Sequence, residues 1–228
     1  MIKKFLLTLI VLTMFLTSTF AVTEKEVKEM ENNIKAKELE PYIVQLIAIG
    51  FDFTSCSGVL LSNEEYNATV LTCKHCISST FEMYADDVKV STIHTAVKDD
   101  LAYLVLERPI KNKKAARIAT NKPKLEEDIF MLGRPGMTIT YYKSGIIKKY
   151  TDNWGFAKLD VIGGCSGTGI FNKDNELVGI VWGAYSEGTE GASFFSPGIG
   201  GIGIGIFEPL PDIQNFINTL RKILKNKL

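Results

Sequence analysis

The sequence predicts an all-β protein of two packed halves that closes with an α-helix. From Tyr42 onward, short apolar runs separated by polar turns dominate the chain, as is typical of strands in a barrel or a sandwich. A basic, polar stretch at 111–124 interrupts these runs, and we interpret it as an exposed crossing between the halves. The last segment, 212–228, has apolar residues at helical spacing and carries its basic residues late, where they suit the C-terminus of a helix.

The first 21 residues are predicted to be an export signal. Lys3 and Lys4 form a charged start, residues 5–16 form an apolar run, and small residues lead to a cleavage site after Ala21. The apolar run is short for a membrane span, which needs roughly 20 residues, and an uncleaved anchor is the alternative. We therefore expect a secreted or periplasmic protein that has no membrane anchor unless this segment stays uncleaved.

The net charge of the chain limits the classes of partner that it is expected to bind. Cleavage removes two of the 26 basic residues and none of the 26 acidic ones, which leaves a net charge of about −2. That balance argues against nucleic acid as a partner, because proteins that bind it usually carry a basic stripe. The 207 of 228 residues that remain suit one domain with a sizeable core.

The elements follow from local patterns. The charged segment 22–40 predicts a short lead-in helix or a pro-segment. The glycine–isoleucine tract 198–206 is expected to be a flexible loop, because glycine weakens a strand. Strands are predicted in a first half, 41–120, and in a second half, 121–228, at 42–49, 58–61, 69–71, 88–93 and 101–106, and then at 129–133, 138–147, 155–161, 169–171, 177–182 and 192–195.

The segment Gly163–Gly169 carries the strongest chemical signal. Ser166 lies between glycines and is followed by an apolar, strand-like run. Glycine lets the backbone adopt positive φ and approach a substrate closely. Two N–H groups can then point at the place where an attacked carbonyl develops negative charge. The alternative is an ordinary Gly-Ser turn.

A serine nucleophile needs a base, and histidine is the usual one near neutral pH. Of the two histidines, His75 ends an apolar run, whereas His94 lies in a polar connection and is expected to be an exposed loop residue. An orienting carboxylate must lie against the imidazole. Asp100 begins the apolar run 101–106 and is the best candidate, while Asp99 is expected to face water.

Four cysteines are present, and export makes disulfides possible. A zinc site at Cys73-x-x-Cys76 is the rival interpretation. A structural zinc site usually has four ligands, and the sequence has no second pair of this kind. We therefore expect no metal and no cofactor.

Four motifs occur in one order, and together they carry a family resemblance. They are CSGVLLS at 56–62, LTCKHC at 71–76, DLAYL at 100–104 and GCSG at 164–167. They resemble the chymotrypsin-like serine peptidases, and most closely the compact bacterial glutamyl endopeptidase and HtrA-type members. The resemblance covers about 41–225 and implies two packed Greek-key β-barrels of six strands each, with a C-terminal helix.

The resemblance also implies roles for the residues that match. Ser166 would attack a peptide carbonyl, His75 would act as general base and then general acid, and Asp100 would hold His75. The N–H groups of Gly164 and Ser166 would form the oxyanion hole. Protein or peptide would be the substrate, and a catalytically inactive binding protein of the same fold is the alternative function.

For the cysteines, the resemblance implies a disulfide between Cys56 and Cys76. Cys73 and Cys165 are either free and buried or paired with each other. Cys165 stands where trypsin-type zymogens have the aspartate that pairs with a freed N-terminus, so that activation switch is expected to be absent. Its register argues against a cysteine nucleophile.

The resemblance also implies a substrate pocket with walls at Trp182, Gly183 and Gly191 and with Asp160 at its base, because Asp160 precedes Ser166 at the spacing of the acid in the trypsin pocket. An acid in a desolvated pocket favours Arg or Lys in the substrate, because an unpaired buried charge is expensive. The alternative is that Asp160 ends an exposed strand.

Overall fold

The computed structural model describes residues 24–50, 53–65, 67–77, 80–136, 139–186 and 203–225. The chain divides into two compact units, Met1–Ile34 and Lys35–Leu228. In the first unit, the structure describes the greater part of helix α2 (Glu24–Leu39), in the segment for which the sequence predicted a short helix or a pro-segment. The predicted export signal lies outside the described residues. All that follows concerns the second unit.

The first barrel contains six strands that close on themselves. They are β1 (Ile43–Gly50), β2 (Phe53–Glu64), β3 (Asn67–Cys73), β4 (Thr80–Ala85), β5 (Val88–Thr95) and β6 (Leu101–Leu106), and a short 3₁₀ helix, η1 (Glu40–Tyr42), precedes them. Their order is β1-β2-β3-β6-β5-β4, and antiparallel pairing of β1 with β4 closes the barrel. Strand β3 is buried from Ala68 to Cys73, on both faces, so its apolar run does not alternate.

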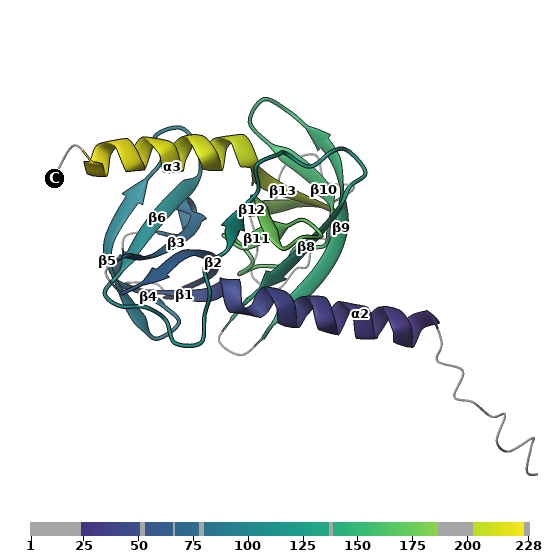
Figure 1. Ribbon diagram of the computed structural model, residues 1–228, viewed down its shortest axis with the longest axis horizontal. Coiled ribbons are helices and arrows are strands. Elements are labelled where there is room, and N and C mark those ends of the chain that lie inside the picture. Colours follow the sequence, from purple (N-terminus) through teal and green to yellow (C-terminus); the bar gives the residue numbers. More distant parts are fainter. Residues whose placement is uncertain are drawn as a thin grey trace, which may run out of the picture. The chain divides into compact units, whose positions relative to one another are not determined.

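The second barrel is built from β8 (Asp128–Gly133), β9 (Tyr141–Tyr150), β10 (Gly155–Lys158), β11 (Gly169–Phe171), β12 (Glu176–Ser186) and β13 (Gly203–Pro209). Their order is β11-β8-β9-β10-β13-β12, and the pairing of β11 with β12 closes the barrel. A strand of two residues, β7 (Arg117–Ile118), pairs with β12 in parallel. The two predicted barrels are therefore confirmed (Figure 1).

Helix α3 (Leu210–Lys225) joins the barrels. It follows β13 of the second barrel and runs across the first (Figure 1). Its apolar residues Ile213, Phe216 and Ile217 belong to the same core cluster as Leu71 and Leu104 of the first barrel. Its apolar stripe is thus buried against strands, as its helical spacing requires.

The structure corrects several expectations. Strand β13 takes up the end of the tract 198–206, because Gly203 to Pro209 pair with β12 and part of this segment pairs with β10. A flexible loop was the wrong prediction there, since Ile206 is buried between these strands. His94 lies on β5 opposite Tyr103 and not in a loop. The predicted strand 192–195 lies outside the described residues.

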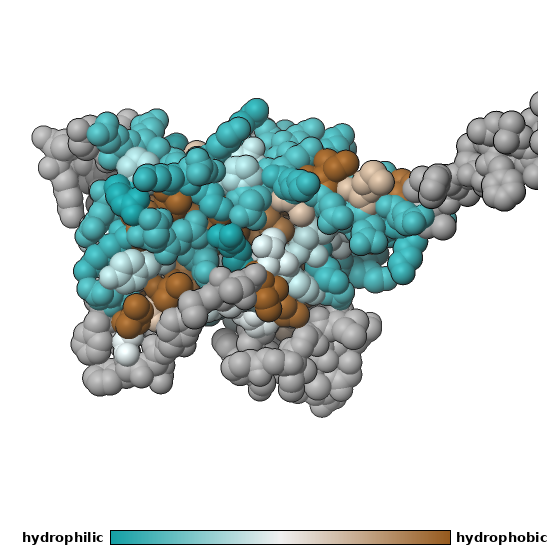
Figure 2. All heavy atoms as spheres, turned by 90° about the horizontal axis from the view of Figure 1, so that it is seen from below, coloured by the Kyte–Doolittle hydropathy of each residue, from teal (hydrophilic) through white to brown (hydrophobic). Residues whose placement is uncertain are grey.

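The surface seen in Figure 2 is mostly hydrophilic, and its hydrophobic side chains form small, separate groups. Among the residues that the structure describes, no helix has both the length and the apolar character needed to cross a bilayer.

Candidate active site

His75 and Asp100 lie at the same edge of the first barrel. His75 is in the 3₁₀ turn η2 (Lys74–Cys76), which follows β3 directly, and Asp100 immediately precedes β6. These strands are antiparallel neighbours in which Cys73 pairs with Leu101, so the end of one meets the start of the other. The Lys74 N–H also donates to the Asp100 carbonyl at 3.0 Å.

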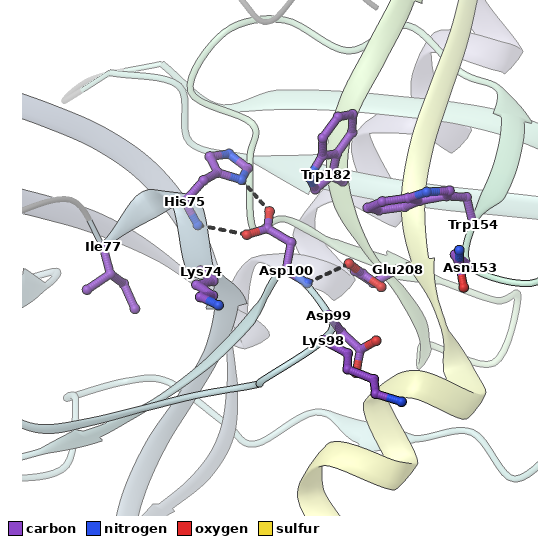
Figure 3. A pocket seen from close by; sticks show the side chains of 10 residues that line it. All are labelled: Lys74, His75, Ile77, Lys98, Asp99, Asp100, Asn153, Trp154, Trp182 and Glu208. Atoms are coloured by element: carbon purple, nitrogen blue, oxygen red, sulfur yellow. Dashed lines mark hydrogen bonds and ion pairs between the residues drawn. The ribbon is translucent and has the colours of Figure 1, made fainter.

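The Asp100 carboxylate holds His75 at two points. Its Oδ1 accepts the His75 backbone N–H at 2.9 Å, and its Oδ2 contacts the ring Nδ1 (Figure 3). The side chain of Asp100 is 18% exposed and that of His75 is 36% exposed. A carboxylate on Nδ1 favours the tautomer in which Nδ1 carries the proton and Nε2 is free to accept one. The structure therefore brings together the predicted base and its predicted orienting acid.

Ser166 lies in a pair of consecutive turns. The Cys165 N–H donates to the Ile162 carbonyl at 3.1 Å, and the Thr168 N–H donates to the Cys165 carbonyl at 3.0 Å. The third position of each turn is a glycine with positive φ, 86° at Gly164 and 81° at Gly167. A type II turn requires this conformation at its third residue, which is why glycine is found at both places.

These turns leave two particular N–H groups unused. The Gly167 N–H donates to the Val181 carbonyl at 2.9 Å, and those of Cys165 and Thr168 close the turns. Within the described part of the chain, the N–H groups of Gly164 and Ser166 donate to no partner. They are the two donors that the sequence predicts for an oxyanion hole.

Both glycines are also packed too closely for a side chain. A Cβ at Gly164 would lie 2.8 Å from Pro135 Cα, and one at Gly167 would lie 2.1 Å from both the Ser57 carbonyl oxygen and Thr72 Oγ1. The close approach at Gly167 is to β2 and β3 of the first barrel. The turn that carries Ser166 is therefore shaped partly by the opposite barrel.

Ser57 fastens this turn to the first barrel. Its N–H donates to the Ser166 carbonyl at 2.9 Å, and its Oγ donates to the Gly164 carbonyl at 3.1 Å. The side chain of Ser57 is fully buried, and Ser166 itself is only 4% exposed. Among the described residues, no hydrogen bond joins Ser166 Oγ to the His75 ring.

A cavity of about 790 Å³ opens beside His75 and Asp100. Trp182 forms one side of it, at 6.5 Å between its ring centroid and that of His75, and packs on Trp154 at 4.8 Å. Figure 3 shows both indoles facing the His75–Asp100 pair across this space. The cavity therefore has room for part of a ligand next to His75.

The predicted pocket residues do not all lie together. Asp160 follows β10, is 44% exposed and pairs with Lys143 at 3.6 Å. It lines a separate cavity of about 280 Å³ with Asp128 and Lys158, away from the one that Trp182 lines. Gly183 lies in β12 opposite Ile206. Gly191 lies outside the described residues.

The four cysteines form one disulfide and leave two free thiols. Cys56 and Cys76 form the predicted disulfide, whereas Cys73 and Cys165 are free and buried. Burial raises the pKa of the Cys165 thiol to about 12, so it carries almost no nucleophilic thiolate near neutral pH.

One group of possible metal ligands exists among the described residues. Atoms of Cys73, His75 and Asp100 lie within 4.8 Å of one another. The ring Nδ1 already contacts the carboxylate, and the Cys73 thiol donates to the Val181 carbonyl at 3.0 Å. Burial, and then the Asp100 charge, raise the pKa of this thiol well above its usual value. This donor set fits a hydrogen-bonded His–Asp pair better than a metal site, because a metal would need the thiolate.

Glu208 is the residue that sequence reasoning missed. It is 2% exposed, and its Oε1 accepts the Asp100 N–H at 2.9 Å. Burial raises the pKa of this carboxyl group to about 7, although the bond from Asp100 acts in the other direction. The available signal was a single acidic residue inside the apolar segment 202–210, where a charge is expensive without a partner.

Comparisons with known proteins agree with this geometry. A model of the trypsin-like peptidase domain matches residues 56–180, which is more than half of the chain. A search of curated proteins found no match. Among solved structures, the active form of the Rv3671c protease from M. tuberculosis matches with a TM-score of 0.63 and 17% identity, over 81% of this chain and 82% of that one.

Two further solved structures are similar at the level of the fold. The serine endoprotease from Yersinia pestis has a TM-score of 0.63 and 21% identity, over 79% of this chain and 62% of that one. The HtrA-type protease AlgW, solved with a tripeptide, has a TM-score of 0.63 and 16% identity, over 79% of this chain and 60% of that one. Because the domain match spans more than half of its length, the chain belongs to the trypsin-like peptidase family and is a serine endopeptidase.

Proposed function

We propose that this serine endopeptidase is exported and hydrolyses peptide bonds in proteins through an acyl-enzyme, with Ser166 as nucleophile. The observation that carries the proposal is the pair of unused N–H groups, those of Gly164 and Ser166, on a turn that presents a serine hydroxyl. A turn that served only to reverse the chain has no need to leave both donors free.

In the proposed reaction, His75 Nε2 removes the Ser166 proton while Oγ bonds to the substrate carbonyl carbon. The carbonyl oxygen becomes an oxyanion and accepts both N–H groups. The imidazolium then donates its proton to the leaving amine as the peptide bond breaks, which gives the acyl-enzyme. Water, deprotonated by His75, attacks the ester, and Ser166 regains its proton as the acid product leaves.

Asp100 supports the charged intermediate in this sequence. Its contact with Nδ1 opposes rotation of the ring, and its negative charge stabilises the imidazolium. The second bond, from the His75 N–H to Oδ1, fixes the carboxylate against the backbone of the residue that it orients.

The predicted signal at residues 1–21 and the Cys56–Cys76 disulfide support export, because disulfides persist in oxidising compartments. Edman sequencing of the protein recovered outside the cytoplasm should begin at Val22. An uncut N-terminus in the membrane fraction would contradict this part of the proposal.

A fluorophosphonate probe tests the catalytic proposal directly. We expect the folded protein to be labelled at Ser166, and the Ser166→Ala variant to lose both labelling and peptide hydrolysis. Cys165→Ser is the matched control, since it removes the neighbouring thiol and should keep labelling. Labelling that is absent from the wild type, or that survives Ser166→Ala, would overturn the proposal.

For specificity, the ion pair with Lys143 partly neutralises Asp160, so we expect only a weak preference for Arg or Lys before the cleaved bond. Digestion of a peptide library by the wild type and by Lys143→Met measures this. If Asp160 faces the substrate, removal of the lysine strengthens the preference, and cleavage mainly after Glu or large apolar residues would end the proposal.

A further inference from the structure

We propose that Glu208 is a positioning residue for the His75–Asp100 pair, and that its ionised form assists the formation of the imidazolium. This inference rests on the proposed catalytic roles of His75 and Asp100. Its direct basis is geometric, since a buried carboxylate from the second barrel accepts the backbone N–H of the orienting acid in the first.

The bond from Asp100 to Glu208 spans the two barrels at the edge of the cavity. Asp100 immediately precedes β6, whereas Glu208 lies near the end of β13, next to α3. Figure 3 shows this bond on the opposite side of Asp100 from His75. Glu208 therefore holds the peptide from which the orienting carboxylate projects, and this carboxylate in turn holds His75 at two atoms.

Acidic groups face Glu208 from several elements. The nearest charges are those of Asp99 and Asp100 before β6, and of Asp212 in the first turn of α3. The basic side chains that line the same cavity are those of Lys74, Lys98 and His75, and the Cys73 thiol also feels the Glu208 charge. Lys122 acts on Asp212 from the second barrel.

The repulsion between Glu208 and the nearby acidic groups is partly offset when His75 takes up a proton and becomes positively charged. In the resting enzyme, an ionised Glu208 and Asp100 repel each other across a buried space. In the transition state, the positive imidazolium is attracted to both carboxylates. An interaction that is stronger in the transition state than in the ground state accelerates the chemical step.

The titration of Glu208 falls in a range that an experiment can reach. Burial raises the pKa of this carboxyl to about 7, so the group changes from neutral to charged between pH 6 and 8. As an uncharged acid it still accepts the Asp100 N–H, and it loses only the electrostatic part of its effect. The two roles, positioning and charge, can therefore be separated.

Glu208→Gln separates them, because the amide oxygen keeps the acceptor and cannot ionise. We expect the ratio of wild-type to variant kcat to be near one at pH 6 and to rise to about threefold to tenfold at pH 9, with KM within about twofold. Asp212→Asn is the matched control, since it removes the same charge without touching Asp100, and its ratio should stay within about twofold. Glu208→Ala, which removes the acceptor as well, should lower kcat at every pH.

A second readout does not depend on activity. The chain has two histidines, so the NMR signals of His94 serve as an internal reference for those of His75. Loss of a nearby negative charge in Glu208→Gln should move the titration midpoint of the His75 ring to lower pH and leave that of His94 in place.

A ratio that stays constant from pH 6 to pH 9, with an unchanged His75 midpoint, would overturn the role of charge and leave a structural bond only. An unlabelled Ser166 in the wild type would instead overturn the proposed function. The His75 titration would still report on Glu208 in that case.

Discussion

The two sides of the candidate site are held together by different parts of the chain. On the side of the proposed base, His75 (the base side), side chains make the decisive contacts, because Asp100 holds His75 and Glu208 holds Asp100. On the side of the nucleophile, the backbone does so, through two turns, two glycines with positive φ and the bonds to Ser57 and Val181. The base side therefore depends on charge and pH, and the nucleophile side depends on the absence of side chains.

The largest expected effect comes from breaking the base side. Asp100→Asn keeps the shape of the side chain but removes its charge and presents a donor or a weaker acceptor to Nδ1. We expect kcat to fall by about 10⁴, because the ring loses the favoured tautomer and the imidazolium loses its counter-charge. Steady-state kinetics on a peptide substrate measure this.

The control for this variant is Asp87→Asn, which removes an exposed acid that pairs with Arg108 and lies in a turn between β4 and β5. It should retain wild-type kcat within about twofold. A kcat for Asp100→Asn within tenfold of the wild type would show that Asp100 does not orient the base.

On the nucleophile side, the addition of a single methyl group at Gly164 should disrupt the turn that carries Ser166. Gly164→Ala forces an alanine to φ 86° and places its Cβ 2.8 Å from Pro135 Cα, so the turn must move. We expect a loss of about 10²–10³ in kcat, the usual effect of removing one oxyanion donor. Fluorophosphonate labelling should slow in parallel with hydrolysis.

Gly136→Ala is the matched variant. Gly136 also has positive φ, 77°, but no atom of the described residues lies within 4 Å of a Cβ built on it. It should cost about 1–2 kcal/mol of stability from the backbone conformation alone and leave kcat within about threefold. Equal losses of activity in both variants would mean that strain, and not the oxyanion donor, explains the effect.

This contrast also explains what the sequence could predict. Gly163–Gly169 is a local motif whose glycines predict positive φ, and the family resemblance then indicated which two N–H groups stay free. His75 and Asp100 are 25 residues apart. Their meeting was predictable because each lies at the end of an apolar strand and because a family resemblance orders them.

Glu208 could not be predicted in the same way. Its contact is tertiary, between β13 and Asp100, the residue before β6, 108 residues away, and the first part of β13, 203–206, was itself expected to be a loop. Pairing with β10 and β12 overrides the weak strand preference of the glycines there. For Asp160, the structure shows an ion pair with Lys143 and a cavity that Trp182 does not line, and its place at the base of a substrate pocket stays a prediction.

The two sides also differ in covalent cross-linking, because a disulfide is present on the base side only. The Cys56–Cys76 disulfide ties η2 to β2 next to His75, whereas Cys165, next to Ser166, is a free thiol. Replacing both Cys56 and Cys76 with alanine should lower the free energy of unfolding by about 2–4 kcal/mol, measured by urea denaturation. Dithiothreitol should destabilise the wild type and leave the double variant unchanged, and an unaltered urea midpoint in that variant would contradict the prediction.

The smallest expected effect is on stability and concerns Glu208 again. Its pKa is about 7 in the folded protein and near 4.5 in an unfolded chain, so the folded state binds more protons between these values. Stability must then fall as pH rises from 4.5 to 7 and stay lower above it, by about 3 kcal/mol at most. Glu208→Gln, which never ionises, should therefore be more stable than the wild type at pH 8 and nearly equal to it at pH 5, as measured by thermal unfolding.

Asp87→Asn again provides the comparison, because the hydrogen bond from Arg108 lowers the pKa of Asp87 and so gives its ionisation the opposite sign. That variant should gain no stability at pH 8. If Glu208→Gln is both more stable and slower at alkaline pH, the base side keeps a buried charge that disfavours folding because the same charge favours the transition state. If the difference in stability between Glu208→Gln and the wild type does not change with pH, the pKa of Glu208 is the same in the folded and unfolded states, and burial does not disfavour its charge.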